Sequence, residues 1–465
     1  MTLLTALDLG TTTMAGVLLD VERGDLLHVA SRPNDAALPV NLPTRAEQDP
    51  ARLLTLALDV LSELTAVGRP VDGIALSGQM HGILCAGPGA QPLTPLITWQ
   101  DRRTAEPLPG SGTMLDRLHA HVADLDWRRN GCRIHHGYGA ATLFWWLQQQ
   151  ALPAGTHHVC DVAGWLAAQL TGSPPSMDPT LAASWGIYDL LDRAWNAPFL
   201  GGLGIDPRHL PPIHDSGVRV GGLGRSLAHR VGLVAGLPVY NPVGDNQASF
   251  LGTAVQAAGV EGLHVSGAVL LNLGTGGQVS WAVPHFQPPA EPVETRPLPG
   301  AGYLRVGASL CGGGAYAWLA RTVESWLDEF GVEIDPEAIL QKLNALARAC
   351  PDSGGLRVRP TFLGVRGDPE IVGGAIEGIP FDALRLGPLA RATLVGIVDE
   401  LYNLYAAHGG PSAGAARLIA AGGAVRRNPL LMELMENRFD LPALLADHPA
   451  PGAAGAAHLA ALSAH

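Results

Sequence analysis

The chain is poor in lysine. Among its 465 residues and 30 basic side chains, Lys342 is the single lysine and all the others are arginine. A Walker A loop needs a lysine next to Ser or Thr after a glycine-rich turn, and protein kinases need one on a strand behind their Gly-rich loop. Lys342 has neither context, and Schiff-base chemistry would have to rest on it alone. Any nucleotide must therefore be held without a lysine.

Charge and cysteine are also scarce. Charged residues make up 15% of the chain, the net charge is −12, and no basic block occurs, so neither nucleic acid nor an anionic membrane is expected as a partner. No apolar run reaches about 18 residues, and the N-terminal segment lacks the basic region of a signal peptide. The five cysteines are never spaced as C-x-x-C, which favours free thiols in a reducing compartment. A cytoplasmic protein is the expectation.

A strand–loop–strand pattern occurs twice, about half the chain apart. Apolar residues 3–7 and 15–19 flank a Gly/Thr turn, and residues 268–272 and 278–283 flank a second one. Strand and helix patterns alternate along the chain, including a helix over residues 49–64, which indicates an α/β fold. The repeat predicts a duplicated domain with a cleft between the halves, whereas two unrelated hairpins are the alternative.

Both turns could bind phosphate through their backbone. Successive N–H groups in such turns form an anion nest, and threonine hydroxyls add donors, so two facing nests could replace a lysine. Asp8, at the end of the first strand, is placed to hold Mg²⁺ directly or through water. A plain β-turn with Asp8 as turn former is the alternative. The residues of the two nests are Gly10, Thr11, Thr12, Thr13, Gly274, Thr275 and Gly276.

Other candidate residues stand at predicted strand ends. Asp245 lies at a strand-to-helix junction, where α/β proteins place catalytic groups, although helix capping is an alternative. Residues 79–81 offer an amide and an imidazole between two glycines, and residues 99–103 combine aromatic, amide and charged groups. Both segments suit a polyhydroxylated ligand, with a structural histidine and a solvated turn as alternatives. Small residues at 420–424 would let a flat base approach the backbone, unless this is only a helix junction.

Two further segments carry structural expectations. The proline-rich stretch 284–299 is interpreted as an exposed loop of the second half, because its composition is too polar for a core. The alanine-rich stretch 453–462 follows a Pro-Gly pair and predicts a closely packed helix.

The order of these motifs resembles the FGGY family of carbohydrate kinases, within the actin-like ATPase superfamily, over essentially the whole chain. Residues 8–12 and 273–276 look like its two phosphate motifs, 78–82 like the sugar loop of xylulokinase-type members, and 244–246 like the catalytic aspartate segment. Residues 421–429 resemble the adenosine motif. Residues 360–369 resemble the second-domain signature, with Val365 in place of the frequent glutamate.

The resemblance implies two actin-like (ribonuclease H-like) α/β domains with a catalytic cleft between them. Residues 1–252 would hold the sugar and the first phosphate loop, and residues 253–465 the second phosphate loop and the adenosine site. ATP and Mg²⁺ are the implied cofactors, a small-molecule sugar is the partner, and a homodimer is left open. The implied roles are Asp245 as general base, Asp8 for the metal, Gln79, Met80, His81, Trp99, Asp101 and Asn246 for the sugar, and Gly422, Gly423 and Asn428 for adenosine beside the two nests.

Three substrate classes compete within the family. Glycerol kinases share the Trp-Gln-Asp-Arg-Arg segment but have Asn-Gln-Arg-Glu where this chain has Gln79, Met80 and His81. Xylulokinases share Gln-Met-His but usually have Trp-Asn-Asp after the next strand. The combination found here, together with residues 361–364, is most similar to sedoheptulose-phosphorylating members, with a pentulose as the alternative. A non-enzymatic actin-like ATP-binding protein is the alternative of another class, but it would not need the polar sugar loop.

Overall fold

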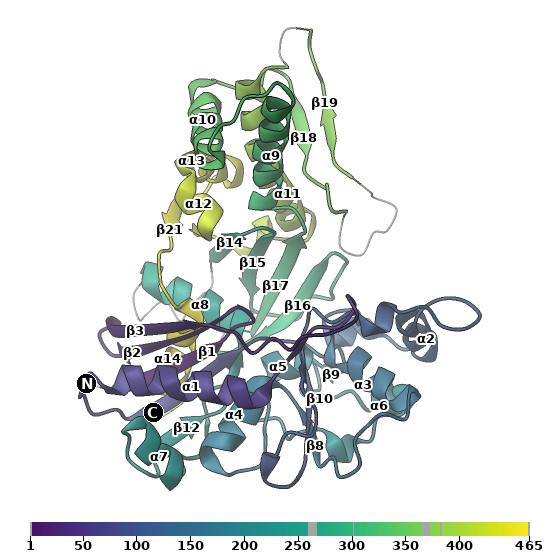
Figure 1. The fold of residues 1–465 in the computed structure, drawn as a ribbon, viewed down its shortest axis with the longest axis vertical. Coiled ribbons are helices and arrows are strands. Elements are labelled where there is room, and N and C mark those ends of the chain that lie inside the picture. Colours follow the sequence, from purple (N-terminus) through teal and green to yellow (C-terminus); the bar gives the residue numbers. More distant parts are fainter. Residues whose placement is uncertain (1, 259–266, 301, 365–372, 382–383, 464–465) are drawn as a thin grey trace.

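A computed structural model describes residues 2–258, 267–300, 302–364, 373–381 and 384–463. They form two α/β domains, one above the other in Figure 1, each built around a mixed sheet. In each sheet, an antiparallel hairpin is joined to a parallel strand through its first strand. The repeated strand–loop–strand pattern is therefore confirmed as a repeated structural unit. Among the described residues, no helix is long and apolar enough to cross a membrane.

The sheet of the first domain has the order β11-β12-β5-β1-β2-β3, and β13 also pairs with β5. Its strands are β1 (Leu3–Leu9), β2 (Thr13–Asp20), β3 (Asp25–Pro33), β5 (Gly73–Gly78), β11 (Arg219–Gly222), β12 (Pro238–Tyr240) and β13 (Val243–Gly244). Short strand pairs outside this sheet are β4 (Glu47–Gln48) with β7 (Leu96–Ile97), β6 (Leu84–Ala86) with β8 (His158–Cys160), and β9 (Tyr188–Asp189) with β10 (Ala194–Trp195). The helices are α1 (Pro50–Thr65), α2 (Met114–His121), α3 (Gly139–Gln148), α4 (Val162–Thr171), α5 (Pro179–Ala183), α6 (Ala197–Leu203), α7 (Arg225–Val231) and α8 (Asp245–Ala258).

The sheet of the second domain has the order β16-β17-β15-β14-β20-β21. Its strands are β14 (Ala268–Leu273), β15 (Gly277–Val283), β16 (Val293–Leu298), β17 (Gly302–Ser309), β20 (Arg417–Ala421) and β21 (Ala443–Leu445), and β18 (Arg357–Arg359) pairs with β19 (Ala375–Glu377) apart from it. The helices are α9 (Gly313–Glu329), α10 (Pro336–Ala349), α11 (Leu386–Ala407), α12 (Gly423–Arg427), α13 (Pro429–Phe439) and α14 (Pro451–Ser463). The Val365 position of the predicted signature lies outside the described residues.

Helix α1 shows how local sequence sets an element. Asp49 caps it by accepting a hydrogen bond from Ala51 N at 2.9 Å, and Pro50 fits the first helical position because it has no N–H to satisfy. Leu53, Leu56 and Val60 recur at helical spacing and are buried in the core beneath the sheet. The predicted helix over residues 49–64 is confirmed.

The last helix joins the two domains. α14 follows β21 of the second sheet but packs against α8, β1 and β5 of the first domain. Only small residues allow this approach, since a Cβ on Gly455 would lie 1.9 Å from the carbonyl oxygen of Ala248. The same buried cluster contains Leu4 of the first sheet and Ile419 of the second. The predicted closely packed helix is confirmed, and it lies at the domain junction.

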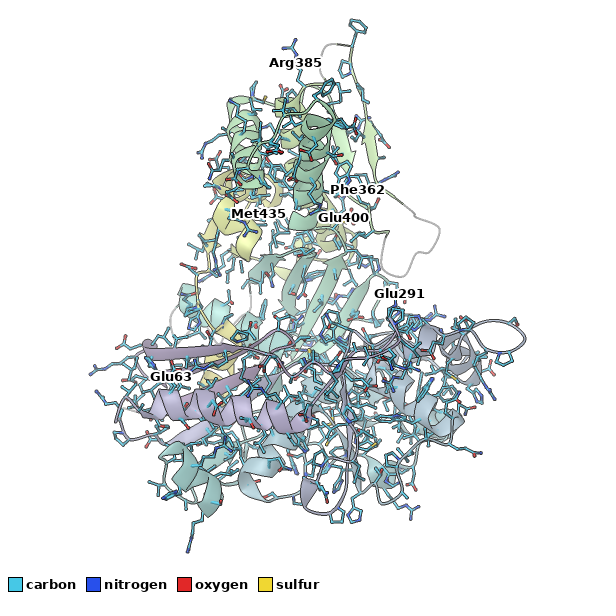
Figure 2. All side chains as sticks on the ribbon, in the orientation of Figure 1. Glu63, Glu291, Phe362, Arg385, Glu400 and Met435 are labelled. Carbon is cyan, nitrogen blue, oxygen red and sulfur yellow. The ribbon has the colours of Figure 1, made fainter. Side chains whose placement is uncertain are left out.

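The stretch 284–299 is only in part the exposed loop that its composition predicts, because residues 284–292 lie outside the strands and several are exposed, whereas the residues after them are not a loop. Residues 293–298 form the edge strand β16, in which Thr295 is fully buried. Thr295 N donates to the carbonyl oxygen of Gly131 at 2.8 Å, so the strand is bonded to the first domain. Just before it, Glu291 lies at the junction of the domains (Figure 2) and is 3.6 Å from His135. The expectation was wrong for residues 293–298 because partners distant in sequence satisfy the polar groups of this strand.

Candidate active site

Two carboxylates meet where β1 ends and α8 begins. Asp8 lies near the end of β1, and Asp245 is the first residue of α8, directly after β13. Ser77, beside Asp8 in the parallel strand β5, donates its hydroxyl to Asp8 Oδ1 at 2.5 Å. Burial raises the pKa of Asp8, whereas burial and then the charge of Asp8 raise the pKa of Asp245 to about 7. Two neighbouring carboxylates repel each other when both are ionised. A divalent cation bound beside them would stabilise this doubly ionised state.

The first turn of α14 approaches the same carboxylate. A Cβ on Gly452 would stand 2.6 Å from Asp8 Oδ2, so only glycine fits at this position without a shift. The N-terminus of a helix carries a partial positive charge, which favours a nearby carboxylate. A segment that follows the second sheet therefore takes part in the environment of Asp8.

The first Gly/Thr loop is tied to the predicted sugar segments by a network of side chains. Trp99 Nε1 donates to Thr11 Oγ1 at 2.8 Å, and this hydroxyl lies 3.3 Å from Gln79 Oε1. Gln48 completes the network, because its Nε2 donates to the carbonyl oxygen of Thr11 at 3.0 Å and its Oε1 accepts from Gln79 at 2.9 Å. Sequence reasoning missed Gln48, whose only local signal was its place just before the helix cap Asp49.

His81 has an unusual backbone conformation. Its φ of 72° is in the left-handed region, which is costly for a residue with a side chain. Ser184 holds it from two sides, since His81 N donates to Ser184 Oγ at 2.9 Å and His81 Nδ1 lies 2.6 Å from Ser184 O. The imidazole stacks on Tyr138 with ring centroids 4.2 Å apart. Strain held in place by neighbours is typical of functional loops, and Tyr138 is a second residue that sequence reasoning missed.

Three of the predicted sugar residues lie beneath the surface of this region. Asp101 is 1% exposed, and Arg103 and Ala46 N bind both of its oxygens. Gln79 is 1% exposed and Met80 6%, whereas Trp99 is 45% exposed. Buried side chains that are already engaged can shape a site more readily than they can bind its ligand. The structure thus separates supporting residues from those that reach the surface.

The second loop lines a cavity of about 220 Å³ in the second domain. Gly274 and Thr275 form part of its wall, next to the start of α9. The loop is held against α9 by backbone hydrogen bonds, from Gly313 N to Gly274 O and from Gly314 N to Thr275 O, each at 2.9 Å. The three consecutive glycines at 312–314 permit this contact, because a Cβ on any of them would come within 2.7 Å of a backbone oxygen of the loop. This glycine run was a signal that sequence reasoning overlooked.

The predicted adenosine residues meet at the same cavity or beside it. Gly422 has a φ of 101°, and a Cβ there would lie 2.3 Å from the carbonyl oxygen of Leu273. Asn428 lines the cavity, caps α13 through Leu430 N, and donates Nδ2 to Asn344 Oδ1 at 2.9 Å. Gly423 is the first residue of α12. The polar side chains that line the cavity beside Asn428 are Thr275, Tyr316, Arg321, Asn344 and Arg427.

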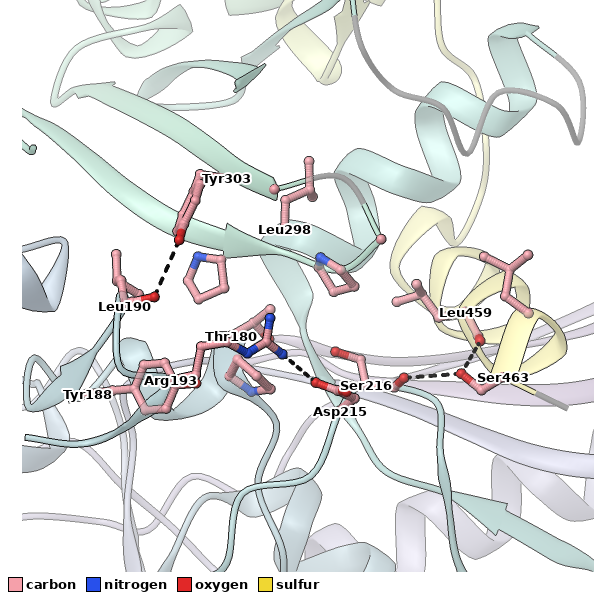
Figure 3. A pocket seen from close by; sticks show the side chains of 16 residues that line it. Thr180, Tyr188, Leu190, Arg193, Asp215, Ser216, Leu298, Tyr303, Leu459 and Ser463 are labelled. Carbon is pink, nitrogen blue, oxygen red and sulfur yellow. Dashed lines mark hydrogen bonds and ion pairs between the residues drawn. The ribbon is translucent and has the colours of Figure 1, made fainter. Parts of the chain in front are cut away.

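A larger cavity of about 440 Å³ lies at the domain junction (Figure 3). Its walls come from the β16–β17 turn, from α14 and from the region around α5, and Arg193 pairs with Asp215 at 2.6 Å on its lining. None of the predicted sugar or phosphate residues lines it. It adjoins the catalytic segment indirectly, because the lining residue Thr180 accepts a hydrogen bond from Gly244 N at 2.7 Å.

Two α/β domains with a repeated strand–loop–strand unit, and a carboxylate pair at the end of the first central strand, match the architecture of the actin-like class. The family models of the FGGY carbohydrate kinases match residues 3–252 (N-terminal domain) and 269–464 (C-terminal domain). The chain belongs to this family and is an ATP-dependent carbohydrate kinase. The fold class expected from the sequence, with two actin-like domains, is confirmed.

Individual relatives differ in their substrates. Human sedoheptulokinase is 29% identical over 94% of this chain and 92% of its own length. Glycerol kinase from Thermus brockianus is also 29% identical, over 95% of this chain and 86% of its own length. The crystal structure of xylulose kinase from Rhodospirillum rubrum superposes with a TM-score of 0.86 at 26% identity, covering 100% of this chain and 90% of that one.

Proposed function

We propose that the chain transfers the γ-phosphoryl group of ATP to the terminal hydroxyl of a ketose, and that sedoheptulose is the preferred acceptor, giving sedoheptulose 7-phosphate. The observation that carries this proposal is the Gln79–His81 loop, which Ser184 holds and which Thr11 links to Trp99. The loop lies beside the catalytic segment, because a Cβ on Gly244 would be 3.0 Å from the side chain of Met80. The similarity to human sedoheptulokinase over nearly the whole of both chains supports the choice of acceptor.

Asp245 is the proposed general base. A base works best when its pKa lies near the operating pH, and a pKa of about 7 gives Asp245 that property. It would accept the proton of the terminal hydroxyl as the oxygen attacks the γ-phosphorus. Phosphoryl transfer has a loose transition state, so positioning and charge stabilisation provide most of the remaining rate enhancement.

His81, Trp99 and Asn246 are the proposed direct sugar contacts. The carbonyl oxygen of Ser184 can only accept, so His81 Nδ1 donates to it and this bond fixes the orientation of the ring that would face the sugar. Trp99 offers a half-exposed ring face to the C–H face of the sugar. Gln79, Met80 and Asp101 are assigned to the same site as supports from below.

The two loops are proposed to bind the triphosphate, and the 220 Å³ cavity to bind the adenosine. Residues Gly10 to Thr13 and Gly274 to Gly276 would provide backbone and hydroxyl donors from the two domains. The carboxylate pair fits Mg²⁺, which usually binds through one or two carboxylates plus substrate phosphates and waters. Asp8 would hold this ion, whose charge would offset the charge that develops on the transferred group.

A screen of acceptors tests the proposal. ADP release is measured by a coupled assay with sedoheptulose, D-xylulose, D-ribulose, L-ribulose and glycerol at equal concentrations. The expected result is the highest kcat/KM with sedoheptulose. If sedoheptulose gives no more signal than the other acceptors, the substrate assignment is wrong.

D-Xylulose is the second candidate. The superposition with the Rhodospirillum rubrum xylulose kinase and the shared Gln-Met-His loop favour it. A higher kcat/KM with D-xylulose than with sedoheptulose would select this alternative. A cytoplasmic location also remains a proposal, resting on the cysteine usage of the chain.

A further inference from the structure

We propose that the buried pair Glu294–Arg296, on β16 of the second domain, positions the sugar-binding loop of the first domain. Both are positioning residues, acting through Tyr138 and Ser184, which lie on two sides of His81. The inference rests on the proposed role of His81 in binding the acceptor and adds a link between that site and the second domain.

The first path runs through Tyr138. Its hydroxyl donates to Glu294 Oε1 at 2.8 Å and accepts from Arg296 Nη2 at 3.1 Å. Arg296 in turn pairs with Glu294 Oε2 at 2.6 Å, so the phenol is held between both members of the pair. Because His81 stacks on this ring, the ring plane that the pair fixes also fixes the orientation of the imidazole.

The second path runs through the backbone that supports His81. Arg296 Nη1 donates to the carbonyl oxygen of Ala183 at 2.9 Å, and the next residue, Ser184, binds both His81 N and His81 Nδ1. One guanidinium therefore contacts both supports of a residue whose φ is unfavourable. The two paths end on the same imidazole, one at its face and one at its edge.

The pair lies where the two domains join. Thr295, between its two members, is bonded to Gly131, and Pro297 O accepts a hydrogen bond from Gln247 of α8 at 3.2 Å. Gln247 is two residues after Asp245. β16 thus contacts both the base-bearing helix and the residues that support the sugar loop, so a change in the relative orientation of the domains would alter these contacts.

A purely structural role is the competing explanation. The side chain of Arg296 is 4% exposed and that of Glu294 14%, and a buried ion pair can serve only to satisfy its own charges. The two explanations predict different kinetic effects. Loss of a positioning role raises the KM for the acceptor and leaves ATP binding unchanged, whereas a loss of stability affects both substrates.

The test compares Tyr138→Phe, Glu294→Ala and the double variant with a matched control. Tyr138→Phe keeps the stacked ring and removes only the hydroxyl. The control is Arg305→Lys on the adjacent strand β17, because Arg305 is equally buried (3% exposed, as is Arg296). Within the described part of the chain, its guanidinium donates to Gln287, Pro288 and Thr295 of the second domain. KM and kcat for acceptor and for ATP are measured with the acceptor that the unaltered protein phosphorylates fastest, together with Tm.

Each single variant is expected to raise the KM for the acceptor about tenfold and to change the KM for ATP by less than about twofold. The double variant should raise the KM for the acceptor no more than the more severe single variant does, because both single changes remove the same hydrogen bond. Arg305→Lys should lower Tm and leave the acceptor KM unchanged. An acceptor KM that stays constant in Tyr138→Phe, or that rises equally in Arg305→Lys, would overturn the proposal. Because the acceptor is chosen by its rate, failure of the sedoheptulose assignment does not affect this outcome.

Discussion

The β1–β2 and β14–β15 loops occupy equivalent places in the two domains. In both, a Leu-Gly-Thr sequence leaves the end of a central strand that has an antiparallel neighbour on one side and a parallel neighbour on the other. The residue before it differs, because Asp8 in the first loop corresponds to Asn272 in the second. The first loop therefore has a carboxylate where the second has a neutral amide.

The glycines of the two loops differ as well. A Cβ on Gly10 would meet the carbonyl oxygen of Thr13 at 2.7 Å, whereas a Cβ on Gly274 would meet no protein atom within 4 Å. The first glycine is needed to close its own turn, and the second leaves open space beside the 220 Å³ cavity. Under the proposed function, the two units have different roles, with metal and proton chemistry assigned to the first domain and nucleotide binding to the second.

The largest expected effect comes from removing the proposed base, Asp245, at the end of the first-domain sheet. Asp245→Asn should lower kcat by at least the roughly 10²–10⁴-fold typical of general-base removal, because the amide cannot accept the hydroxyl proton. ATP affinity, measured by calorimetry, should change little, since the nucleotide cavity lies in the other domain. Turnover within about tenfold of the unaltered protein would contradict the assignment of Asp245.

Exchanging the distinguishing residues of the two loops should give the next largest effect. Asp8→Asn should lower kcat about a hundredfold and raise the Mg²⁺ concentration needed for half-maximal rate, because the proposed ligand loses its charge. The reverse change, Asn272→Asp, should instead raise the KM for ATP by placing negative charge near the polyphosphate. Both are read from initial rates over a Mg²⁺ series. Equal effects of the two variants would show that the loops are not specialised.

Alanine substitutions at the two loop glycines test the same difference between the loops, with smaller expected effects. Gly274→Ala should leave Tm unchanged and raise the KM for ATP about tenfold, because the added methyl group occupies space that only a ligand would use. Gly10→Ala should lower Tm by several degrees, since a backbone oxygen must move to make room for the methyl group. Thermal melts with and without ATP distinguish the two. A fall in Tm for Gly274→Ala without nucleotide would contradict the open space inferred there.

Features encoded in short segments were predictable from the sequence. The two strand–loop–strand units, the α1 cap at Asp49 and the packed helix α14 follow from local patterns of apolar, glycine and capping residues. The placement of Asp245 at a strand-to-helix junction was also predicted, whereas its role as base came from the family resemblance, because an acid at such a junction can equally cap the helix. In these places local preference and the tertiary structure agree, which makes the sequence pattern reliable.

Features that depend on distant partners were not predictable. Residues 284–299 appear too polar for a core, yet Arg296 of β16 is buried because Tyr138, 158 positions earlier, and Ala183 satisfy it. The burial of Asp101 was not predictable, because its pairing with Arg103 cannot be inferred from a charged run of residues. Gln48 was missed for the same reason, since its partners Thr11 and Gln79 lie on other strands and loops.

The smallest effect concerns the acid limb of the pH–rate profile. A base must be deprotonated to work, so a pKa of about 7 for Asp245 means that kcat/KM for the acceptor falls about tenfold per pH unit below about pH 7 and is level above it. Part of this raised pKa comes from the charge of Asp8, so Asp8→Asn should move the limb to lower pH in whatever activity it retains. Asn272→Asp, with its new charge in the other loop, should leave the limb in place. Profiles from pH 5 to 9 measure both, and a limb that moves to higher pH in Asp8→Asn would show that the charge on Asp8 does not raise the pKa of the base.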